Sequence, residues 1–243
     1  MNKRERLERT IAGEPCDRPP VALWQHYPGD DLRAADLAQT FIEEQRAFDW
    51  DIACLMPGST YQVIDYGIHE IWHGTTHGER EITRHSVGRS LDWTELRSLD
   101  PTRGGYGRQI ECVRMVCTAL DDTPVLLTIY SPLAQAEMLA GQELLLRHLR
   151  TQSDRLKSGL NILTENLLRF IETLRKLPLA GVCYVIRHAN YDVLAEDEYR
   201  SFGYPYDKQI LAAVPQRWWL NAVRVEGITP MLRLTSSLPG QVM

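Results

Sequence analysis

Polar side chains directly follow a short apolar run in the second half of the chain. Residues 182–186 are apolar, and Arg187, His188 and Asn190 come immediately after them. An imidazole in such a position could act as an acid, a base or a hydrogen-bond donor near neutral pH. A neighbouring guanidinium could bind a carboxylate through two parallel hydrogen bonds. The spacing therefore predicts a small-molecule site that starts at His188.

Two of these residues also have a purely structural interpretation. His188 could hydrogen-bond the carbonyl of a neighbouring loop, and the sequence leaves this alternative open. Arg187 could instead pair with Asp192 or Glu196 and brace the loop. For the arginine, we favour this pairing over a contact with substrate.

Two further apolar runs end in polar side chains of the same kind. Residues 125–131 have Tyr130 near their end, and residues 21–27 have Gln25 and His26. If each run is a parallel strand of a barrel, these side chains meet at one mouth, although a tyrosine there can also be a packing residue. We predict catalytic roles for His188 and Tyr130, and substrate-binding roles for Gln25, His26, Arg187 and Asn190.

One short motif suggests a metal. Residues His69–His73 fit the His-Glu-x-x-His pattern of zinc proteases, in which one helix presents both histidines to the ion. The glycines and β-branched residues around the motif favour strands instead. Along a strand, residues four apart are separated by ~13 Å, too far to share one zinc. We therefore predict no metal site, and the nearby His77 and His85 do not change this.

Apolar runs alternate with helical patterns along the chain, which is typical of a parallel sheet with helical connections. The predicted strands are 21–27, 51–57, 125–131, 182–186 and 217–224, with the start of a sixth at 241–243. The predicted helices are 3–12, 32–48, 106–120, 133–139, 142–151 and 154–176, one that begins near Glu196, and a short one within 228–238. Residues 61–87 break the pattern and favour a β-hairpin inserted after the second strand.

These elements predict an α/β fold with about five to six parallel strands, which is either a (β/α)₈ TIM-barrel type that is incomplete or an open doubly wound sheet. The 243 residues suffice for one large core, so we expect a single domain over residues 1–243.

Composition excludes several classes of function. The net charge is −5 and no block of basic residues is present, which argues against nucleic-acid binding. No apolar run approaches the ~18 residues of a membrane span, and the charged N-terminus lacks the apolar core of a signal peptide. The five cysteines are widely spaced without a Cys-x-x-Cys pair, as in reduced proteins. We expect a cytoplasmic protein that binds a small-molecule substrate. A homodimer is possible.

Four stretches spread along the chain carry a family resemblance. They are RERLERTIAGEPCDRPPVALW at 4–24, LDWTELRSLDP at 91–101, TPVLLTIYSPLAQAEMLAG at 123–141 and HANYDVLAEDEYRSFGYPYDKQIL at 188–211. In this order they resemble the uroporphyrinogen decarboxylase superfamily, whose members include tetrapyrrole carboxy-lyases and cobalamin-linked methyltransferases. The resemblance implies a (β/α)₈ barrel of which this chain looks like the N-terminal two thirds to three quarters, and so a C-terminal truncation.

The resemblance carries over few site residues. The family's decarboxylases have two arginines just after the first strand, where this chain has Gln25, His26 and Tyr27. Their aspartate after the second strand matches about Gly58. Tyr130 does match a family active-site tyrosine.

Two further positions depart from the family pattern. His188 lies where the decarboxylases carry a small hydroxyl residue. The methyltransferase branch holds zinc with a His-x-Cys pair that aligns with Arg224, Val225 and Glu226, and an arginine supplies no ligand.

We therefore expect a family member that does not measurably decarboxylate uroporphyrinogen. If the chain is active, the resemblance implies either a carboxy-lyase that needs no cofactor or a corrinoid-dependent methyltransferase that lacks the usual zinc ligands. The third alternative is an inactive remnant or a binding subunit completed by a partner, because an open sheet leaves unpaired strand edges.

Overall fold

Four parallel strands form the main sheet of the computed structural model, which describes residues 1–75, 78 and 80–243. Their order across the sheet is β1 (Ala53–Leu55), β4 (Val125–Tyr130), β5 (Gly181–Ile186) and β6 (Ala222–Val225). Every residue of β1, β4 and β5 is buried. Such continuous apolar strands are typical of parallel sheets that are covered on both faces.

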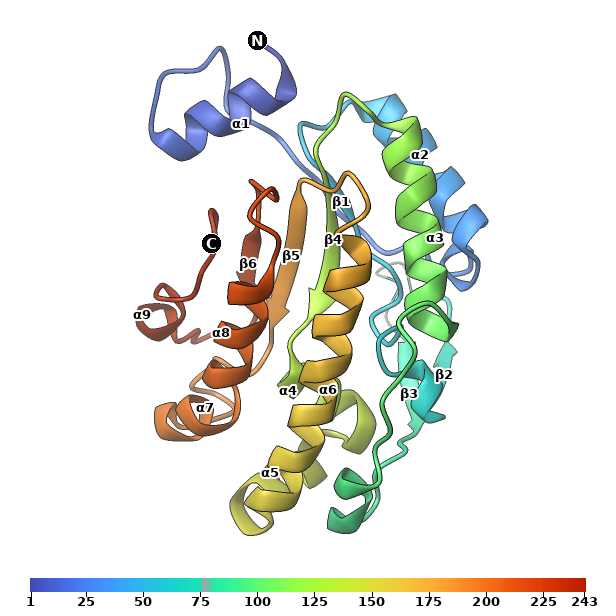
Figure 1. The fold of residues 1–243 in the computed structure, drawn as a ribbon, viewed down its shortest axis with the longest axis vertical. Coiled ribbons are helices and arrows are strands. Elements are labelled where there is room, and N and C mark those ends of the chain that lie inside the picture. The colour runs from blue at the N-terminus through green and yellow to red at the C-terminus, as the bar shows by residue number, and fades with distance from the viewer. Residues whose placement is uncertain (76–77, 79) are drawn as a thin grey trace.

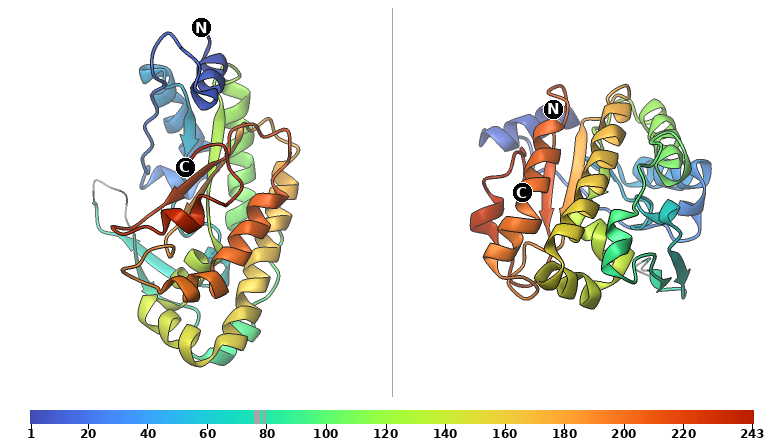
Figure 2. Two further views of the ribbon diagram at one scale, coloured as in Figure 1. Left: turned by 90° about the vertical axis from the view of Figure 1, so that its left-hand side faces the viewer. Right: turned by 60° about the horizontal axis from the view of Figure 1, so that its bottom comes forward.

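Helices connect the strands and cover one face of the sheet. They are α1 (Lys3–Ala12), α2 (Ala34–Phe48), α3 (Gly104–Ala119), α4 (Pro132–Ala140), α5 (Gln142–Thr151), α6 (Ser153–Leu174), α7 (Glu196–Phe202), α8 (Tyr204–Ala213) and α9 (Leu232–Thr235). Short 3₁₀ helices are η1 (Asp30–Leu32), η2 (Ile64–Tyr66) and η3 (Ser90–Thr94). Figure 1 shows α3, α6 and α8 in front of the sheet and α1 beyond the end where the strands begin, and the left view of Figure 2 shows these three helices on one side of the sheet. Within the described ranges, no helix combines the length and the apolar character needed to cross a membrane.

The predicted hairpin within 61–87 is confirmed. Strands β2 (His69–Trp72) and β3 (Arg80–Arg84) pair antiparallel and form a separate two-stranded sheet. In Figure 1 this hairpin lies near the end where the central strands finish. The His-Glu-x-x-His motif therefore lies on a strand and the turn after it rather than on a helix, and His77 falls outside the described residues.

The predicted first strand, residues 21–27, is wrong. This segment is extended but joins no sheet, and its contact with the β1 region includes one backbone hydrogen bond, from Asp51 N to Val21 O. Pro19 and Pro20 precede it and lack the N–H groups that a paired strand would need. Val21 itself is half exposed.

The predicted count of five to six strands is also wrong, because the described residues form four. Within 217–224 only the end becomes β6, since Trp218 N bonds Pro215 O in a turn. Residues 241–243 contribute one isolated parallel bridge, between Val242 and Ala222. The sheet is consequently open between β1 and β6.

A buried carboxylate ties the N-terminal segment to the start of β1. Asp51 accepts hydrogen bonds from Arg6 Nη1 at 2.6 Å, from Arg18 Nη1 at 2.6 Å and from Val21 N at 2.7 Å. Its burial opposes ionisation, yet these donors lower the pKa of Asp51. These contacts fix the position of the start of the extended segment that leads to His26.

Asp207 of α8 is a second buried carboxyl group. The hydroxyls of Tyr184 on β5 and Tyr199 on α7 each donate a hydrogen bond to it at 2.6 Å. Burial raises the pKa of Asp207 to about 6, against the opposing effect of the two tyrosine bonds. This cluster fastens the helical layer to β5.

We predict that Asp207→Asn changes how stability depends on pH. A carboxyl whose folded pKa, about 6, exceeds its ordinary 3.8 stabilises the fold while it is protonated, and this contribution disappears as the pH rises through 6. Chemical denaturation should show the stability of the wild type, relative to Asp207→Asn, falling by roughly 3 kcal/mol between about pH 4 and 6. A difference that is constant across this range would contradict the assignment.

Candidate functional site

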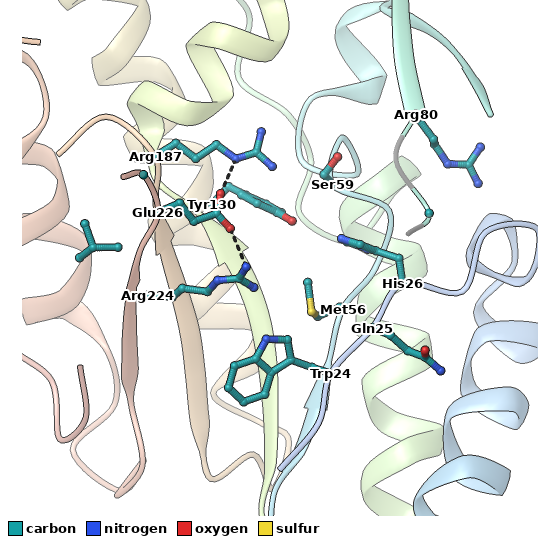
Figure 3. Close-up of a pocket in the computed structure, with 13 residues that line it drawn as sticks. Trp24, Gln25, His26, Met56, Ser59, Arg80, Tyr130, Arg187, Arg224 and Glu226 are labelled. Carbon is teal, nitrogen blue, oxygen red and sulfur yellow. Dashed lines mark hydrogen bonds and ion pairs between the residues drawn. The ribbon is translucent and has the colours of Figure 1, made fainter. Parts of the chain in front are cut away.

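A cleft with a volume of about 920 Å³ lies at the carboxyl ends of the central strands. The described residues that line it are Trp24, Gln25, His26, Met56, Ser59, Gly78, Arg80, Tyr130, Arg187, Arg224, Val225, Glu226 and Gly227. Figure 3 shows Arg187, Arg224 and Glu226 on one wall, His26, Ser59 and Arg80 on the other, and Tyr130 and Met56 between them. The cleft thus has a charged wall from β5 and β6 and a mixed wall from the N-terminal segment and the hairpin.

The pleat of the strands decides which side chains reach this cleft. Successive residues of a strand point to opposite faces. On β5, Tyr184 points to the helical layer, where it meets Asp207. Arg187, three residues on, has the opposite parity and lines the cleft, whereas His188 has the parity of Tyr184.

Glu226 is shared by two arginines. Its carboxylate lies 3.2 Å from Arg187 Nε and 3.1 Å from Arg224 Nη2. All three side chains are only partly exposed, at 30–39%. Because two guanidinium groups share one carboxylate, this wall carries an excess positive charge. The predicted pairing of Arg187 with Asp192 or Glu196 is therefore wrong.

Tyr130 lies between the two walls of the cleft and contacts Arg187 of the charged wall. The Arg187 guanidinium lies over its ring, 4.9 Å from the centroid, a cation–π contact. Burial raises the pKa of Tyr130 to about 12, while the Arg187 charge opposes the shift. The phenol therefore stays protonated and can donate a hydrogen bond to an oxygen atom in the cleft.

Arg80 on the opposite wall is held by acidic side chains behind it. It contacts Asp31 Oδ1 at 2.5 Å and Glu70 Oε1 at 3.6 Å, and Glu70 also accepts a hydrogen bond from Thr60. The Arg80 side chain is 8% exposed. These contacts fasten the hairpin over the cleft and leave this wall without excess positive charge.

Gln25 and His26 line the cleft, but neither is free of structural contacts. Gln25 Nε2 donates to Glu44 Oε2 of α2 at 2.6 Å, and Tyr27 donates to the same oxygen at 2.8 Å. Burial lowers the pKa of His26, so the imidazole is neutral near pH 7. A Cβ on Gly78 would come within 2.5 Å of His26 Cβ, so only glycine fits there.

His188 is not brought into the cleft. It is 2% exposed, and its Nε2 lies 3.4 Å from Glu137 Oε2 of α4. Burial and, second, the charge of Arg187 lower the pKa of His188 to about 4. His188, which the sequence predicts to be the centre of the site, is therefore a neutral, buried side chain next to α4.

Asn190 also lies outside the cleft lining. Its Oδ1 accepts hydrogen bonds from the Thr229 hydroxyl at 3.0 Å and from the Asp192 backbone N at 3.2 Å. It packs against Gly227, where a Cβ would come within 2.2 Å of Asn190 Nδ2. Asn190 therefore joins the loop after β5 to the loop after β6. It contacts Gly227, which lines the cleft, but does not line the cleft itself.

Sequence reasoning missed three charged residues of the cleft as ligand-binding groups. By resemblance, Arg224 and Glu226 stand out only as replacements of zinc ligands, although their alternation at a strand end predicts that both lie on one face. Arg80 gives no signal, because its position depends on how the hairpin packs.

Comparison with known proteins places the chain in a family. A family model described as uroporphyrinogen decarboxylase (URO-D) matches residues 2–224. The chain belongs to the uroporphyrinogen decarboxylase family. Among curated proteins, the sequence finds no match.

A solved structure with the same fold is a methyltransferase from Methanosarcina mazei. It matches with a TM-score of 0.82 at 16% sequence identity, over 100% of this chain and 75% of that chain. Likeness at this identity shows the fold alone. It confirms the predicted barrel-type α/β fold, which in this chain has an open sheet.

The geometry explains one departure from the uroporphyrinogen decarboxylase pattern. A Cβ on Gly58, the position that the family resemblance matches approximately to an aspartate, would come within 2.7 Å of Asp31 Oδ2. The Asp31 carboxylate therefore takes up the space beside Gly58, but it is paired with Arg80. A carboxylate is present near this position without a free negative charge.

The zinc site of the family's methyltransferases does not fit these residues. Arg224 has no lone pair to offer a metal, and Glu226 is already engaged by two guanidinium groups. In the part of the chain that the structure describes, no group of three or more His, Cys, Asp or Glu residues could hold a metal.

We predict that His188 titrates far below an ordinary histidine. NMR of the imidazole C–H groups, assigned with His188→Asn, should give a pKa of about 4. Arg187→Gln should raise this pKa, because the guanidinium charge is one of its causes, whereas Arg114→Gln on the exposed side of α3 should leave it unchanged. Titration near 6.5 would show that His188 is accessible to water.

Proposed function

We propose that this chain binds a carboxylate-bearing tetrapyrrole, of the class for which its family is named, in the cleft, and does not decarboxylate it. The observation that supports the proposal is the sharing of Glu226 by Arg187 and Arg224. The excess positive charge on that wall favours an anion, and each guanidinium keeps further N–H donors for ligand carboxylates.

The rest of the lining suits a flat ring with acidic substituents. Trp24 and Met56 supply apolar surface, and the Tyr130 hydroxyl supplies a donor. A volume of about 920 Å³ lies near the upper end of ordinary small-molecule sites, which run to roughly 1,000 Å³.

Neither the acidic group that lines the cleft, Glu226, nor Asp31 behind Arg80 supports decarboxylation. Loss of CO₂ from a protonated pyrrole needs a carboxylate that stabilises the cationic ring. Glu226 is engaged by Arg187 and Arg224, and Asp31 is engaged by Arg80. Neither retains the free negative charge that this role requires.

Binding of uroporphyrin, a stable oxidised relative of uroporphyrinogen, tests the proposal. Quenching of its fluorescence by the wild type should give saturable binding that weakens with salt. Arg187→Gln and Arg224→Gln should each weaken binding by about 10- to 100-fold, because each removes a charged donor. Glu226→Gln should strengthen it, because both guanidinium groups are released.

Two controls give the test its specificity. Arg114→Gln removes an exposed arginine of α3 and should bind as the wild type does. Incubation with uroporphyrinogen should yield no product with fewer carboxyl groups. Equal binding by all variants would exclude this cleft, and turnover by the purified chain would refute the second half of the proposal.

Corrinoid-dependent methyl transfer is the second candidate function, and the fold of the Methanosarcina mazei methyltransferase supports it. Saturable binding of cobalamin without binding of uroporphyrin would favour it. A third candidate is a C-terminally truncated remnant or a binding subunit completed by a partner, to which the open sheet between β1 and β6 would be suited.

A further inference from the structure

The extended N-terminal segment presents one histidine to the cleft. Gln25 Nε2 and the Tyr27 hydroxyl donate hydrogen bonds to the same oxygen of Glu44 on α2, at 2.6 and 2.8 Å. Side chains alternate along an extended chain, so His26, between these two residues, faces the opposite way. Figure 3 shows the Gln25 side chain directed away from the cleft and the imidazole of His26 directed into it.

The surrounding chain holds His26 in this position. Asp30 N and Asp31 N both donate to Tyr27 O, at 3.2 and 3.0 Å. Gly78 of the hairpin packs directly against the Cβ of His26. Among the described residues, the buried Nδ1 of the imidazole has no hydrogen-bond partner. Burial of Nδ1 leaves Nε2 as the ring nitrogen that a ligand in the cleft can reach.

We infer that the tetrapyrrole bound in the cleft carries a metal ion, and that His26 Nε2 is the axial ligand of this metal. The inference rests on the proposed function, because the tetrapyrrole supplies four nitrogen ligands and the chain supplies only the fifth. Imidazole is the commonest metal ligand in proteins, and it holds the haem iron of globins and peroxidases.

Binding exchanges one ligand of the metal for another. A coordinated water leaves the fifth position, and Nε2 donates its lone pair in its place. The proton of the neutral imidazole stays on Nδ1, and no atom changes its oxidation state. Because a metal–imidazole bond is only ~2 Å long, one face of the tetrapyrrole must lie against His26.

This orientation agrees with the proposed contacts on the other wall. The carboxylates of a uroporphyrin are on flexible side chains, which can fold out of the plane of the ring. A ring that turns one face to His26 can therefore direct its carboxylates to Arg187 and Arg224, which Figure 3 shows on the opposite wall.

The other potential axial ligands of the lining are less suitable. A tyrosine binds a metal as the phenolate, but burial raises the pKa of Tyr130 to about 12 and so keeps the phenol protonated. Glu226 is engaged by two guanidinium groups. Met56 offers a thioether, a soft ligand that suits Zn²⁺ less well than an imidazole does. His26 is therefore the best axial ligand that the cleft offers.

Zinc uroporphyrin and metal-free uroporphyrin test the inference, because they carry the same carboxylates and differ only at the centre of the ring. In fluorescence titrations, the wild type should bind the zinc form at least about 10-fold more tightly than the metal-free form. His26→Gln should abolish this preference. His69→Gln, which removes an exposed histidine of β2 outside the cleft lining, should retain it.

A measurement on the wild type keeps the inference falsifiable if His26→Gln fails to fold. In the zinc complex, the imidazole C–H resonances of His26 should move far upfield, because an axial ligand lies over the centre of the aromatic ring. Equal affinity for the two forms, unmoved resonances, or a preference that survives in folded His26→Gln would overturn the axial ligand and leave the proposed binding of uroporphyrin intact. Binding of neither form would refute the proposed function and this inference together.

Discussion

The alternation of side chains along parallel strands is the constraint on which the rest of this structure depends. Along β5 and the two residues that follow it, Tyr184 and His188 lie on the side of the helices, whereas Arg187 lies on the side of the cleft. One residue of displacement would exchange the two sets. A buried, neutral imidazole and a cleft-lining guanidinium are therefore neighbours in sequence with unrelated environments.

Charge pairing then sets what the concave face can bind. Arg80 is matched by the acidic groups Asp31 and Glu70 behind it. The exception is Glu226, which two arginines share. Where carboxylates balance the arginine, as around Arg80, the contacts hold the chain in place. At Glu226 the balance is broken, and the excess positive charge that faces the cleft is the basis of the proposed binding of an anion.

Much of the fold could be predicted from the sequence, and the failures have physical reasons. The runs 125–131 and 182–186 are strands as predicted, because buried parallel strands are apolar throughout. Residues 21–27 have a similar composition but no strand, since pairing depends on a neighbour that composition does not reveal. In the site, position after a strand correctly brought Tyr130 and Arg187 to the cleft. It failed for His188, because the position after a strand does not by itself tell on which face of the sheet a side chain lies. It gave no indication for Arg80, whose place in the cleft depends on how the hairpin packs.

The unbalanced charge at Glu226 also bears on the stability of the cleft. The two partly buried guanidinium groups that share this carboxylate repel each other more strongly than they would in water, because both are partly desolvated. Any anion that binds between Arg187 and Arg224 relieves this repulsion and so stabilises the folded state in proportion to its concentration. Removal of either guanidinium would relieve the same repulsion without a ligand. Binding of an anion and loss of one arginine are thus two routes to the same charge balance on this wall.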